Sequence, residues 1–318
     1  MGAEYSSNMD VHRTARLMDG RALASRIVSE TRTEVDKARS WAASVPGLAV
    51  ILVGASPASH IYVEAKLRKA REVGIVTFEH RFDDLDEHSL LNLVEQLNAD
   101  PRVHGILVQL PLPSHVDHRR VLAAVSPDKD ADGFHPQNQG RLFTNSPGIV
   151  PCTPRGCLEL IRQEVPHLEG LDAVVVGASS IVGRPMAALL LNQGCTVSIG
   201  HKSSRELSSL TRRADVLVVA AGRPGLVRRD WVKPGAIVVD VGISRVPDPV
   251  LGSRIVGDVA FDEVSGIAGA ITPVPGGVGP MTVAMLMANT VDLFLQALGR
   301  PVGGDAGSPA LVPTTHRP

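Results

Sequence analysis

The sequence predicts a two-domain α/β protein with parallel sheets, on the evidence of chain length, strand pattern and one turn-rich break. The chain has 318 residues, which suits two domains at about 150 residues each. Short, apolar, β-branched runs alternate with longer helix-like segments, as in parallel sheets covered on both faces. The predicted strands are Leu48–Gly54, Gly105–Leu110, Ala173–Gly177, Thr196–Gly200, Asp215–Ala221 and Ala236–Gly242.

The break between the two blocks is the segment Asn145–Pro154, NSPGIVPCTP, which concentrates turn residues. We therefore expect a first domain over residues 16–151 and a second over residues 152–278. A final helix-like stretch, Met281–Leu298, fits either block. The ends, residues 1–15 and 300–318, read as flexible tails; the second is rich in Pro and Gly.

Composition excludes several classes of function. A formal net charge of −1 and only 2 Trp, 2 Tyr and 6 Phe disfavour nucleic-acid binding by bulk charge or by stacking. The longest apolar runs are far shorter than the roughly 18 residues of a membrane span, so we expect a soluble protein with no membrane partner. Cys152, Cys157 and Cys195 match no disulfide or zinc pattern. We therefore expect no metal and a reduced, cytoplasmic setting.

A candidate phosphate-binding turn follows the strand Ala173–Gly177. It reads Gly177-Ala178-Ser179-Ser180-Ile181-Val182-Gly183 and leads into a helix-like run. Glycine-bounded turns between a strand and a helix bind pyrophosphate, because helix-end N–H groups face the anion. Ser179 and Val182 depart from the G-x-G-x-x-G spacing, so the turn alone is equally typical of an ordinary strand–helix connection.

The end of the next strand bears on the cofactor. Dinucleotide folds place the adenosine ribose there, about 20 residues beyond the first glycine. This chain has His201-Lys202-Ser203-Ser204 at that place, a cation with hydroxyls instead of the acidic residue typical of NAD sites. The segment favours the 2′-phosphate of NADP. The alternative is that Lys202 is a solvated loop lysine.

Polar residues of the first block form a second candidate site. Ser56 and Pro57 predict a helix from Pro57 to Val73, with Ser56 as its N-cap. Ser59, Tyr62 and Lys66 then share one face and could meet one ligand, although a solvated lysine is the commoner reading.

Two further features of the first block carry polar groups. Gln109 follows the apolar run GILV near the carboxyl end of a predicted strand, where open α/β sheets bind ligands. A glutamine that caps backbone groups in a turn is an equal alternative. Asp128, Asp130 and Asp132 alternate as at the start of an EF-hand loop. Gly133 and Gln139 break that calcium pattern, so we do not expect calcium.

Eight segments in order give the chain a family resemblance from about Met18 to Gly299. They are YVEAKLRKA, VQLPLP, SPDKDADGFHPQNQGRL, PCTPRGCLELI, VGASSIVGRP, DVGI, GDV and TPVPGGVGPMTVAMLMANT. The chain resembles the bifunctional methylenetetrahydrofolate dehydrogenase/cyclohydrolase family.

The resemblance implies a folate-binding catalytic domain, a Rossmann-type NAD(P)-binding domain, and a folate cleft between them. It also implies that the last helix, residues 279–299, returns to the first domain and that homodimers form through the nucleotide-binding domains. The implied reactions are NADP+-dependent oxidation of 5,10-methylenetetrahydrofolate to the methenyl cation and hydrolysis of that cation to 10-formyltetrahydrofolate. The implied partners are folate substrates.

The resemblance also assigns residues. Lys66 aligns with the essential cyclohydrolase lysine, Gln109 with its amide partner, Tyr62 with the tyrosine that stacks on folate and Asp132 with the acid that holds the pterin. The remaining implied folate residues are Ser59, Pro275, Gly276 and Gly277. The implied cofactor residues are Gly177, Ala178, Ser179, Ile181, Val182, Gly183, His201, Lys202, Ser203, Ala221, Gly222, Gly242, Ile243 and Thr282.

The chemistry agrees with these roles. Hydride leaves a carbon whose flanking nitrogens stabilise the cation, so oxidation needs positioning more than an acid or base. Hydrolysis needs a group that exchanges protons with water and a ring nitrogen. A lysine beside a cationic substrate can do so, because the like charge disfavours the ammonium form. Gln109 can orient that amine without adding charge.

One departure bears on the cofactor. Relatives commonly carry Arg where this chain has Ala178, so NAD stays an alternative to NADP. Lys202 stands where Ser is frequent, which suggests that the contact to the 2′-phosphate is relocated to this lysine. Other readings are a dehydrogenase without cyclohydrolase activity, a silent folate- or nucleotide-binding regulator, and a general NADP oxidoreductase for a small acid. The set Lys66, Gln109 and Asp132 speaks against them.

Overall fold

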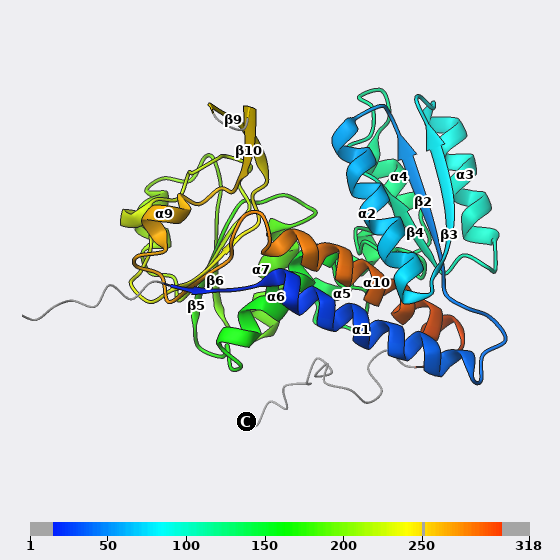
Figure 1. Cartoon of the computed structure of the whole chain (residues 1–318), viewed down its shortest axis with the longest axis horizontal. Helices are drawn as coiled ribbons and strands as arrows, with labels where there is room; N and C mark the ends of the chain where they lie inside the picture. Colours follow the sequence, from blue (N-terminus) through cyan, green and yellow to red (C-terminus); the bar gives the residue numbers. More distant parts are fainter. Residues whose placement is uncertain (1–14, 250–251, 301–318) are drawn as a thin grey trace, which may run out of the picture.

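The chain folds around two parallel sheets joined by two long helices (Figure 1). The computed structural model describes residues 15–249 and 252–300. The predicted tails lie outside the described residues except at their inner ends. Ala15 is buried there and donates its N–H to the carbonyl of Ser265, and the guanidinium of Arg300 stacks over Trp41.

The larger sheet has six strands in the order β1-β11-β8-β7-β5-β6, and every neighbouring pair is parallel. Its strands are β1 (Arg16–Leu17), β5 (Asp172–Val176), β6 (Thr196–Gly200), β7 (Val216–Val219), β8 (Ile237–Asp240) and β11 (Ala270–Ile271). The chain order reverses between β5 and β7, and open α/β sheets bind ligands at the carboxyl ends of the strands beside such a switch point.

The smaller sheet has three strands, with β2 in the centre and parallel to both neighbours. These strands are β2 (Gly47–Val53), β3 (Val76–Phe82) and β4 (Gly105–Val108). Every residue of β2 is buried, because helices cover both faces of this sheet. The covering helices are α2 (Pro57–Val73), α3 (Glu87–Ala99) and α4 (His118–Ala124).

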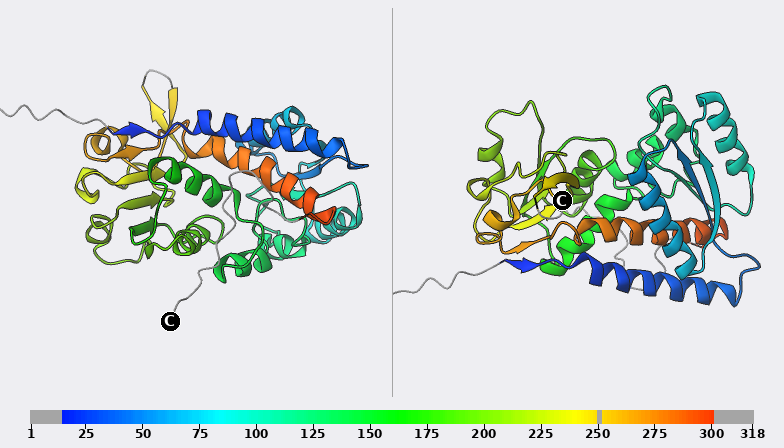
Figure 2. Two further views of the ribbon diagram at one scale, coloured as in Figure 1. Left: turned by 90° about the horizontal axis from the view of Figure 1, so that it is seen from below. Right: turned by 45° about the horizontal axis from the view of Figure 1, so that its top comes forward.

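Helices α1 (Gly20–Arg39) and α10 (Val278–Ala297) lie side by side and span both lobes (Figure 2). Helix α10 also packs on α6 (Cys152–Glu164), on α2 and on β4. By length and mean hydropathy α10 resembles a membrane span, but 61% of it is buried, as in the core helix of a soluble protein. The other helical segments are α5 (Pro136–Phe143), α7 (Gly183–Asn192), α8 (Leu207–Thr211), η1 (Arg229–Trp231) and α9 (Phe261–Val264).

The six strands predicted from sequence are all present within two residues at each end, as β2, β4, β5, β6, β7 and β8. The helix predicted over Pro57–Val73 is α2, with Pro57 in its first turn. Ser56 occupies the N-cap position as predicted, although its side chain makes no capping hydrogen bond.

Five strands of the described residues were not predicted. No residue of the edge strand β3 is fully buried, and the strand carries charged residues, so it lacks the apolar run that marked the others. An antiparallel hairpin, β9 (Ser244–Asp248) and β10 (Gly252–Val256), projects from the larger sheet (Figure 1). Strand β1 was placed with the first domain, yet it pairs with β11 in the larger sheet. Two-residue strands such as β1 and β11 leave no periodic signal.

Candidate functional site

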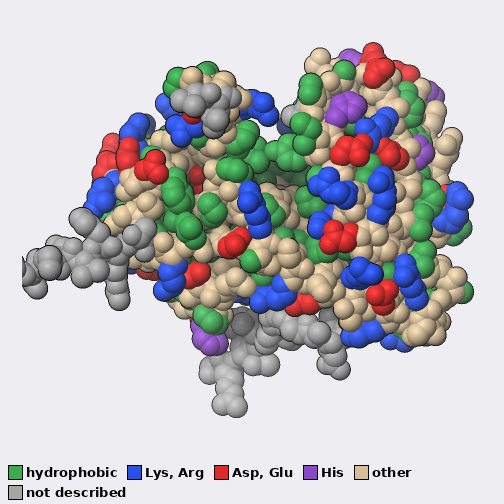
Figure 3. Space-filling view, in the orientation of Figure 1, with side chains coloured by type: hydrophobic (Ala, Val, Ile, Leu, Met, Phe, Trp, Pro, Cys, Tyr) green, Lys and Arg blue, Asp and Glu red, His purple; other side chains and the backbone are tan. Residues whose placement is uncertain are grey.

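A cavity of about 180 Å³ lies where the two lobes meet. The space-filling view shows the hollow between the lobes (Figure 3). The residues that line the cavity come from α2, the end of β4, the loop before α5, the start of α6, the turn after β5, and α10. The lining residues are Lys66, Gln109, Leu110, Asp132, Phe134, Cys152, Thr153, Ile181 and Thr282. Lys66, Gln109, Asp132, Ile181 and Thr282 were all predicted as site residues, from segments far apart in the chain.

Lys66 and Gln109 are joined directly. The ammonium or amine Nζ of Lys66 donates to Oε1 of Gln109 at 2.9 Å, and both side chains are buried. Gln109 is held in turn, because its Nε2 donates to the carbonyl of Leu110 at 2.6 Å. The lysine is therefore oriented by a neutral acceptor at the carboxyl end of β4.

Asp132 completes a buried polar set with this pair. Burial raises the pKa of Asp132 to about 6, against the opposing effect of the nearby positive charge of Lys66. The charged form of a buried carboxylate is costly unless a partner binds it. Asp132 is thus suited to accept hydrogen bonds from a polar ligand that enters the cavity.

Asp130 folds the loop that presents Asp132. Its carboxylate accepts the N–H groups of Gly133, Phe134 and His135 at 2.8 to 3.1 Å, and Nδ2 of Asn138 at 2.9 Å. With these four donors, Asp130 organises the loop and is not free to bind a cation. Among the described residues, no group of three or more His, Cys, Asp or Glu could hold a metal ion.

The other predicted folate residues are not among those that line this cavity. On α2, Ser59 is buried and Tyr62 is 41% exposed, so the tyrosine ring is accessible to a planar ligand. Pro275, Gly276 and Gly277 form the loop before α10. A Cβ on Gly20 would lie 1.8 Å from the carbonyl oxygen of Gly277, so the loop is packed directly against the start of α1.

The predicted phosphate turn is built by close backbone contacts. Gly177 has φ of +123°, and a Cβ there would lie 2.1 Å from the carbonyl oxygen of Ala220 at the end of β7. A Cβ on Gly183 would lie 2.0 Å from the carbonyl oxygen of Gly177. Both positions therefore require glycine, and the turn sits at the β5–β7 switch point.

Within this turn, Ser179 caps the helix that follows. Its Oγ accepts the N–H groups of Val182 and Gly183, at 3.2 and 3.3 Å. Two of the helix-end N–H groups expected to face an anion therefore bond to this hydroxyl. Ala178 is half-buried, and its carbonyl accepts from Nε of Arg184 at 3.1 Å.

The segment after β6 is exposed and internally bonded. The N–H of His201 donates to Oγ of Ser204, and the N–H of Ser203 donates to Nδ1 of His201. These bonds form a compact loop on which Lys202 is exposed. Because β5 and β6 are parallel neighbours, this loop lies at the same edge of the sheet as the Gly177 turn.

The remaining predicted cofactor residues also lie at that edge. Ala221 and Gly222 follow β7, and Gly242 and Ile243 follow β8. Gly242 is buried, while Ala221, Gly222 and Ile243 are exposed. Thr282 instead lines the cavity with Lys66, and its Oγ1 lies 3.0 Å from Oγ1 of Thr153.

Sequence reasoning missed several residues at the two sites. Phe134, Cys152 and Thr153 line the cavity although no pattern marked their side chains, and burial raises the pKa of the Cys152 thiol. Arg184 folds back onto the phosphate turn as an additional cation. Only Arg184 had a sequence signal, its place directly after Gly183.

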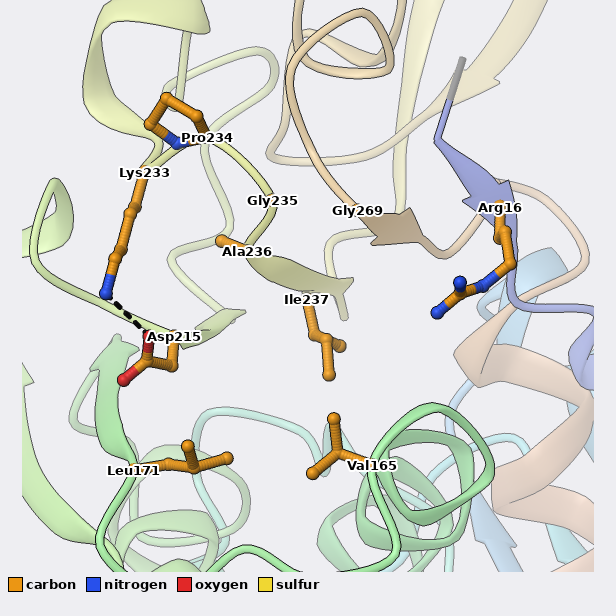
Figure 4. Close-up of a pocket in the computed structure, with 10 residues that line it drawn as sticks. All are labelled: Arg16, Val165, Leu171, Asp215, Lys233, Pro234, Gly235, Ala236, Ile237 and Gly269. Carbon is orange, nitrogen blue, oxygen red and sulfur yellow. Dashed lines mark hydrogen bonds and ion pairs between the residues drawn. The ribbon is translucent and has the colours of Figure 1, made fainter. Parts of the chain in front are cut away.

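A second cavity, about 250 Å³, lies at the opposite, amino-terminal end of the larger sheet (Figure 4). Lys233 forms an ion pair with Asp215 at 2.6 Å on one side, and Arg16 lies on the other. Although larger, this cavity contains none of the predicted site residues. The cavity with Lys66 is the better candidate, because ligands of open α/β sheets bind at the carboxyl ends of the strands.

Comparison with known proteins agrees with this geometry. Residues 18–132 match the tetrahydrofolate dehydrogenase/cyclohydrolase catalytic domain, and residues 151–298 match the tetrahydrofolate dehydrogenase/cyclohydrolase NAD(P)-binding domain. The chain is 54% identical over 279 residues to bifunctional protein FolD 3 of Rhizorhabdus wittichii, covering 87% of this chain and 92% of that protein.

Two solved structures are also similar. The bifunctional enzyme FolD from Campylobacter jejuni has a TM-score of 0.85 and 48% identity. The FolD enzyme of Trypanosoma brucei, in complex with NADP cofactor and inhibitor, has a TM-score of 0.85 and 40% identity. Each match covers 90% of this chain and 99% of the other.

Proposed function

The chain belongs to the tetrahydrofolate dehydrogenase/cyclohydrolase family, and we propose that it oxidises 5,10-methylenetetrahydrofolate with NADP+ and hydrolyses the methenyl product to 10-formyltetrahydrofolate. It is an enzyme of folate one-carbon metabolism with both activities. The roles proposed for individual residues rest on the buried hydrogen bond between Lys66 and Gln109, beside Asp132. Ile181 of the phosphate turn lines the same cavity.

Lys66 is the proton-transfer group in this proposal. Water attacks the methenyl carbon and gives one proton to the amine Nζ of Lys66, and this proton then passes to the ring nitrogen as its bond to the carbon breaks. The hydroxyl left on that carbon loses its proton to solvent as the formyl C=O forms. Gln109 holds Nζ in place through a neutral oxygen, whereas a carboxylate there would stabilise the ammonium form. Positioned acid–base groups of this kind typically contribute about 10²–10⁴-fold.

Asp132 and Tyr62 hold the folate. The carboxylate of Asp132 accepts hydrogen bonds from the pterin amino and ring N–H groups, which compensates the cost of its burial. The exposed ring of Tyr62 stacks on the folate. Ser59 and the loop Pro275–Gly277 complete the folate-binding surface.

The residues that follow β5, β6, β7 and β8 at the carboxyl end of the larger sheet, here called the nucleotide edge, fit NADP. Bound there, the cofactor supplies the hydride acceptor. The glycines at 177 and 183 let the turn pack closely on itself and on the backbone after β7, which shapes it at the switch point where dinucleotide folds bind a pyrophosphate. Lys202 is free of a carboxylate neighbour in the loop His201–Ser204 and offers its charge to a 2′-phosphate. Arg184 adds a second cation near the turn.

We propose the domain division 16–151 with 279–299 and 152–278, with β1 transferred to the second domain because it pairs with β11. The setting we propose is the reduced cytoplasm, since the three cysteines are free and buried.

A homodimer through the nucleotide-binding domain is also part of the proposal. β6 is an edge strand, and Ile199 on it and Leu191 on α7 are exposed apolar residues beside it. Edge strands that expose apolar groups are prone to pair with another chain. Light scattering should give a dimer mass, and Ile199→Lys should shift it to monomer. Leu17→Lys, on the opposite edge strand β1, is the control and should stay dimeric.

The test of function is to supply methylenetetrahydrofolate with NADP+ or NAD+ to the purified protein and follow both products. We expect faster turnover with NADP+ and conversion through methenyl to 10-formyl product. Methenyl accumulation without enzymatic hydrolysis would select a monofunctional dehydrogenase. Turnover only with NAD+ would overturn the assignment of Lys202.

A further inference from the structure

Two buried carboxyl groups accept backbone N–H groups from the segments at the carboxyl end of the larger sheet. Asp240 ends β8 and is 3% exposed, and Asp258 lies between β10 and α9 and is fully buried. Burial raises the pKa of Asp240 to about 7 and also raises that of Asp258. Carboxyl groups are rarely buried without a compensating role, because their charged form is costly to desolvate.

Asp258 is bonded to a segment that was predicted to contact the cofactor. Its Oδ2 accepts the N–H groups of both Ala221 and Gly222, each at 2.7 Å. Ala221 and Gly222 themselves are exposed, and Gly222 has φ of +65°. A fully buried side chain thus fixes the direction of an exposed backbone segment at the carboxyl end of β7.

Asp240 holds Asp258 in place. Its Oδ1 accepts the N–H groups of Gly242 and Asp258, and its Oδ2 accepts that of Val259, all at 2.9 Å. The packing is tight, because a Cβ on Gly257 would lie 1.9 Å from Oδ2 of Asp240. The two carboxyl groups therefore act as one unit that ties the segments after β7, β8 and β10 together.

The pair Asp240 and Asp258 is linked to the proposed phosphate turn through the residues that follow β7. Ala220, next to the Ala221–Gly222 segment, contributes the carbonyl that Gly177 meets at the switch point. Ala221 and Gly222 follow that carbonyl directly, so their direction sets the course of the backbone beside the phosphate turn. We propose that Asp258 is a positioning residue for the dinucleotide, holding Ala221 and Gly222 in the direction that leaves the switch point open. This inference rests on the proposed binding of NADP at that edge.

The inference predicts which affinities change. Asp258 lies away from the loop His201–Ser204, where the 2′-phosphate is placed, so NADP+ and NAD+ should be affected alike. Calorimetry of Asp258→Ala should show both cofactors binding at least about tenfold more weakly. Hydrolysis of methenyl substrate needs no cofactor and should stay within about twofold, which also shows that the variant folds.

Asp258→Asn separates positioning from stability. Its amide oxygen can accept the same two N–H groups, so both cofactors should bind within about threefold of the parent. Its Nδ2 would take the place of Oδ1, which has no hydrogen-bond partner among the described residues, so the melting temperature should fall. Asp258→Ser, whose hydroxyl stops one bond short of the carboxylate oxygens, is the second removal variant if Asp258→Ala does not fold.

Asp215→Ala is the matched control at the other end of the same sheet. Asp215 also accepts a backbone N–H, that of Asp172, and pairs with Lys233 (Figure 4). It should lower stability without weakening cofactor binding. Parent-like cofactor binding by a folded Asp258→Ala or Asp258→Ser overturns the inference, as does equal weakening in Asp258→Asn or in Asp215→Ala. A parent that binds neither cofactor overturns the proposed function as well.

Discussion

The proposed folate cavity and the nucleotide edge present different chemical groups to their ligands. In the cavity, the functional groups are buried side chains, Lys66, Gln109 and Asp132, that interact with one another. At the nucleotide edge, the key features are backbone contacts at Gly177 and Gly183, with an exposed lysine nearby. The first region is suited to proton transfer out of water, and the second to gripping a long, charged ligand.

This difference changes what a substitution does. A buried side chain that carries chemistry cannot be replaced by its neighbours, so its loss should be large and specific to one reaction. A backbone site loses function when a side chain is added, and an exposed charge contributes less because solvent screens it. A cyclohydrolase assay therefore measures the effect of a substitution in the cavity, and a cofactor-binding assay measures the effect of one at the nucleotide edge.

The largest effect is expected for Lys66→Ala. Hydrolysis of methenyltetrahydrofolate should fall by about 10²–10⁴-fold while folate binding survives, because the variant removes the proton-transfer group from the cavity. Steady-state hydrolysis rates and folate calorimetry measure the two effects. Lys69→Ala, a lysine of the same helix paired with Glu72, is the control and should be parent-like. Hydrolysis within a few-fold of the parent in Lys66→Ala would remove the lysine from the mechanism.

Gly177→Ala should give the next largest effect, confined to the other region. An added Cβ would collide with the carbonyl of Ala220, and φ of +123° is strained for alanine. We expect NADP+ and NAD+ to bind about a hundredfold more weakly, with hydrolysis retained, as measured by calorimetry and hydrolysis assays.

Gly140→Ala is the control for this change, since a Cβ there meets nothing within 4 Å. Cofactor affinity unchanged in Gly177→Ala would mean that the turn does not approach the dinucleotide. Loss of hydrolysis together with binding would mean that the two regions are not separable.

Asp132→Ala should weaken folate binding in both reactions by about 10- to 100-fold, because a charged acceptor typically contributes about 1.5–3 kcal/mol. Calorimetry with a folate ligand measures this directly. Unchanged affinity would exclude Asp132 from the folate site.

The parent should also show a pH dependence that Asp132→Ala lacks. The pKa of Asp132 is about 6, so its carboxylate becomes protonated below that pH and loses acceptor capacity. The folate affinity of the parent should therefore fall below about pH 6. Stability has the opposite sign. The pKa is raised on folding from 3.8, so the free energy of unfolding should decrease as pH rises from about 4 to about 6.

The smallest effect is expected for Lys202→Ala. The NADP+ KM should rise and that of NAD+ should stay nearly constant, because NAD+ has no 2′-phosphate to lose. Since Lys202 is exposed, the shift in selectivity should lie near tenfold, the lower end for a charge-assisted contact. Steady-state kinetics with both cofactors decide this. An unaltered ratio would exclude Lys202, and Arg184→Ala would then test the neighbouring cation.

The sequence by itself determined the fold class, six strands and the helix carrying Lys66. Buried parallel strands need continuous apolar runs, and Pro57 with Gly74, a left-handed C-cap, bounds α2 locally. The family resemblance also pointed to Lys66, Gln109 and Asp132, because the segments that contain them occur in the family's order. Short or charged strands such as β1 and β3 were missed, since their pairing depends on partners distant in the chain.

Only the tertiary structure decided which residues meet. It brought Ile181 and Thr282 to the cavity with Lys66, and it placed the fully buried Asp258 under Ala221 and Gly222. The segment GDV contains Asp258, but no local pattern marks its hydrogen bonds, because they join residues 36 and 37 positions apart. A sequence records which groups are available, but long-range packing fixes their distances, their burial and hence the pKa of a group such as Asp132.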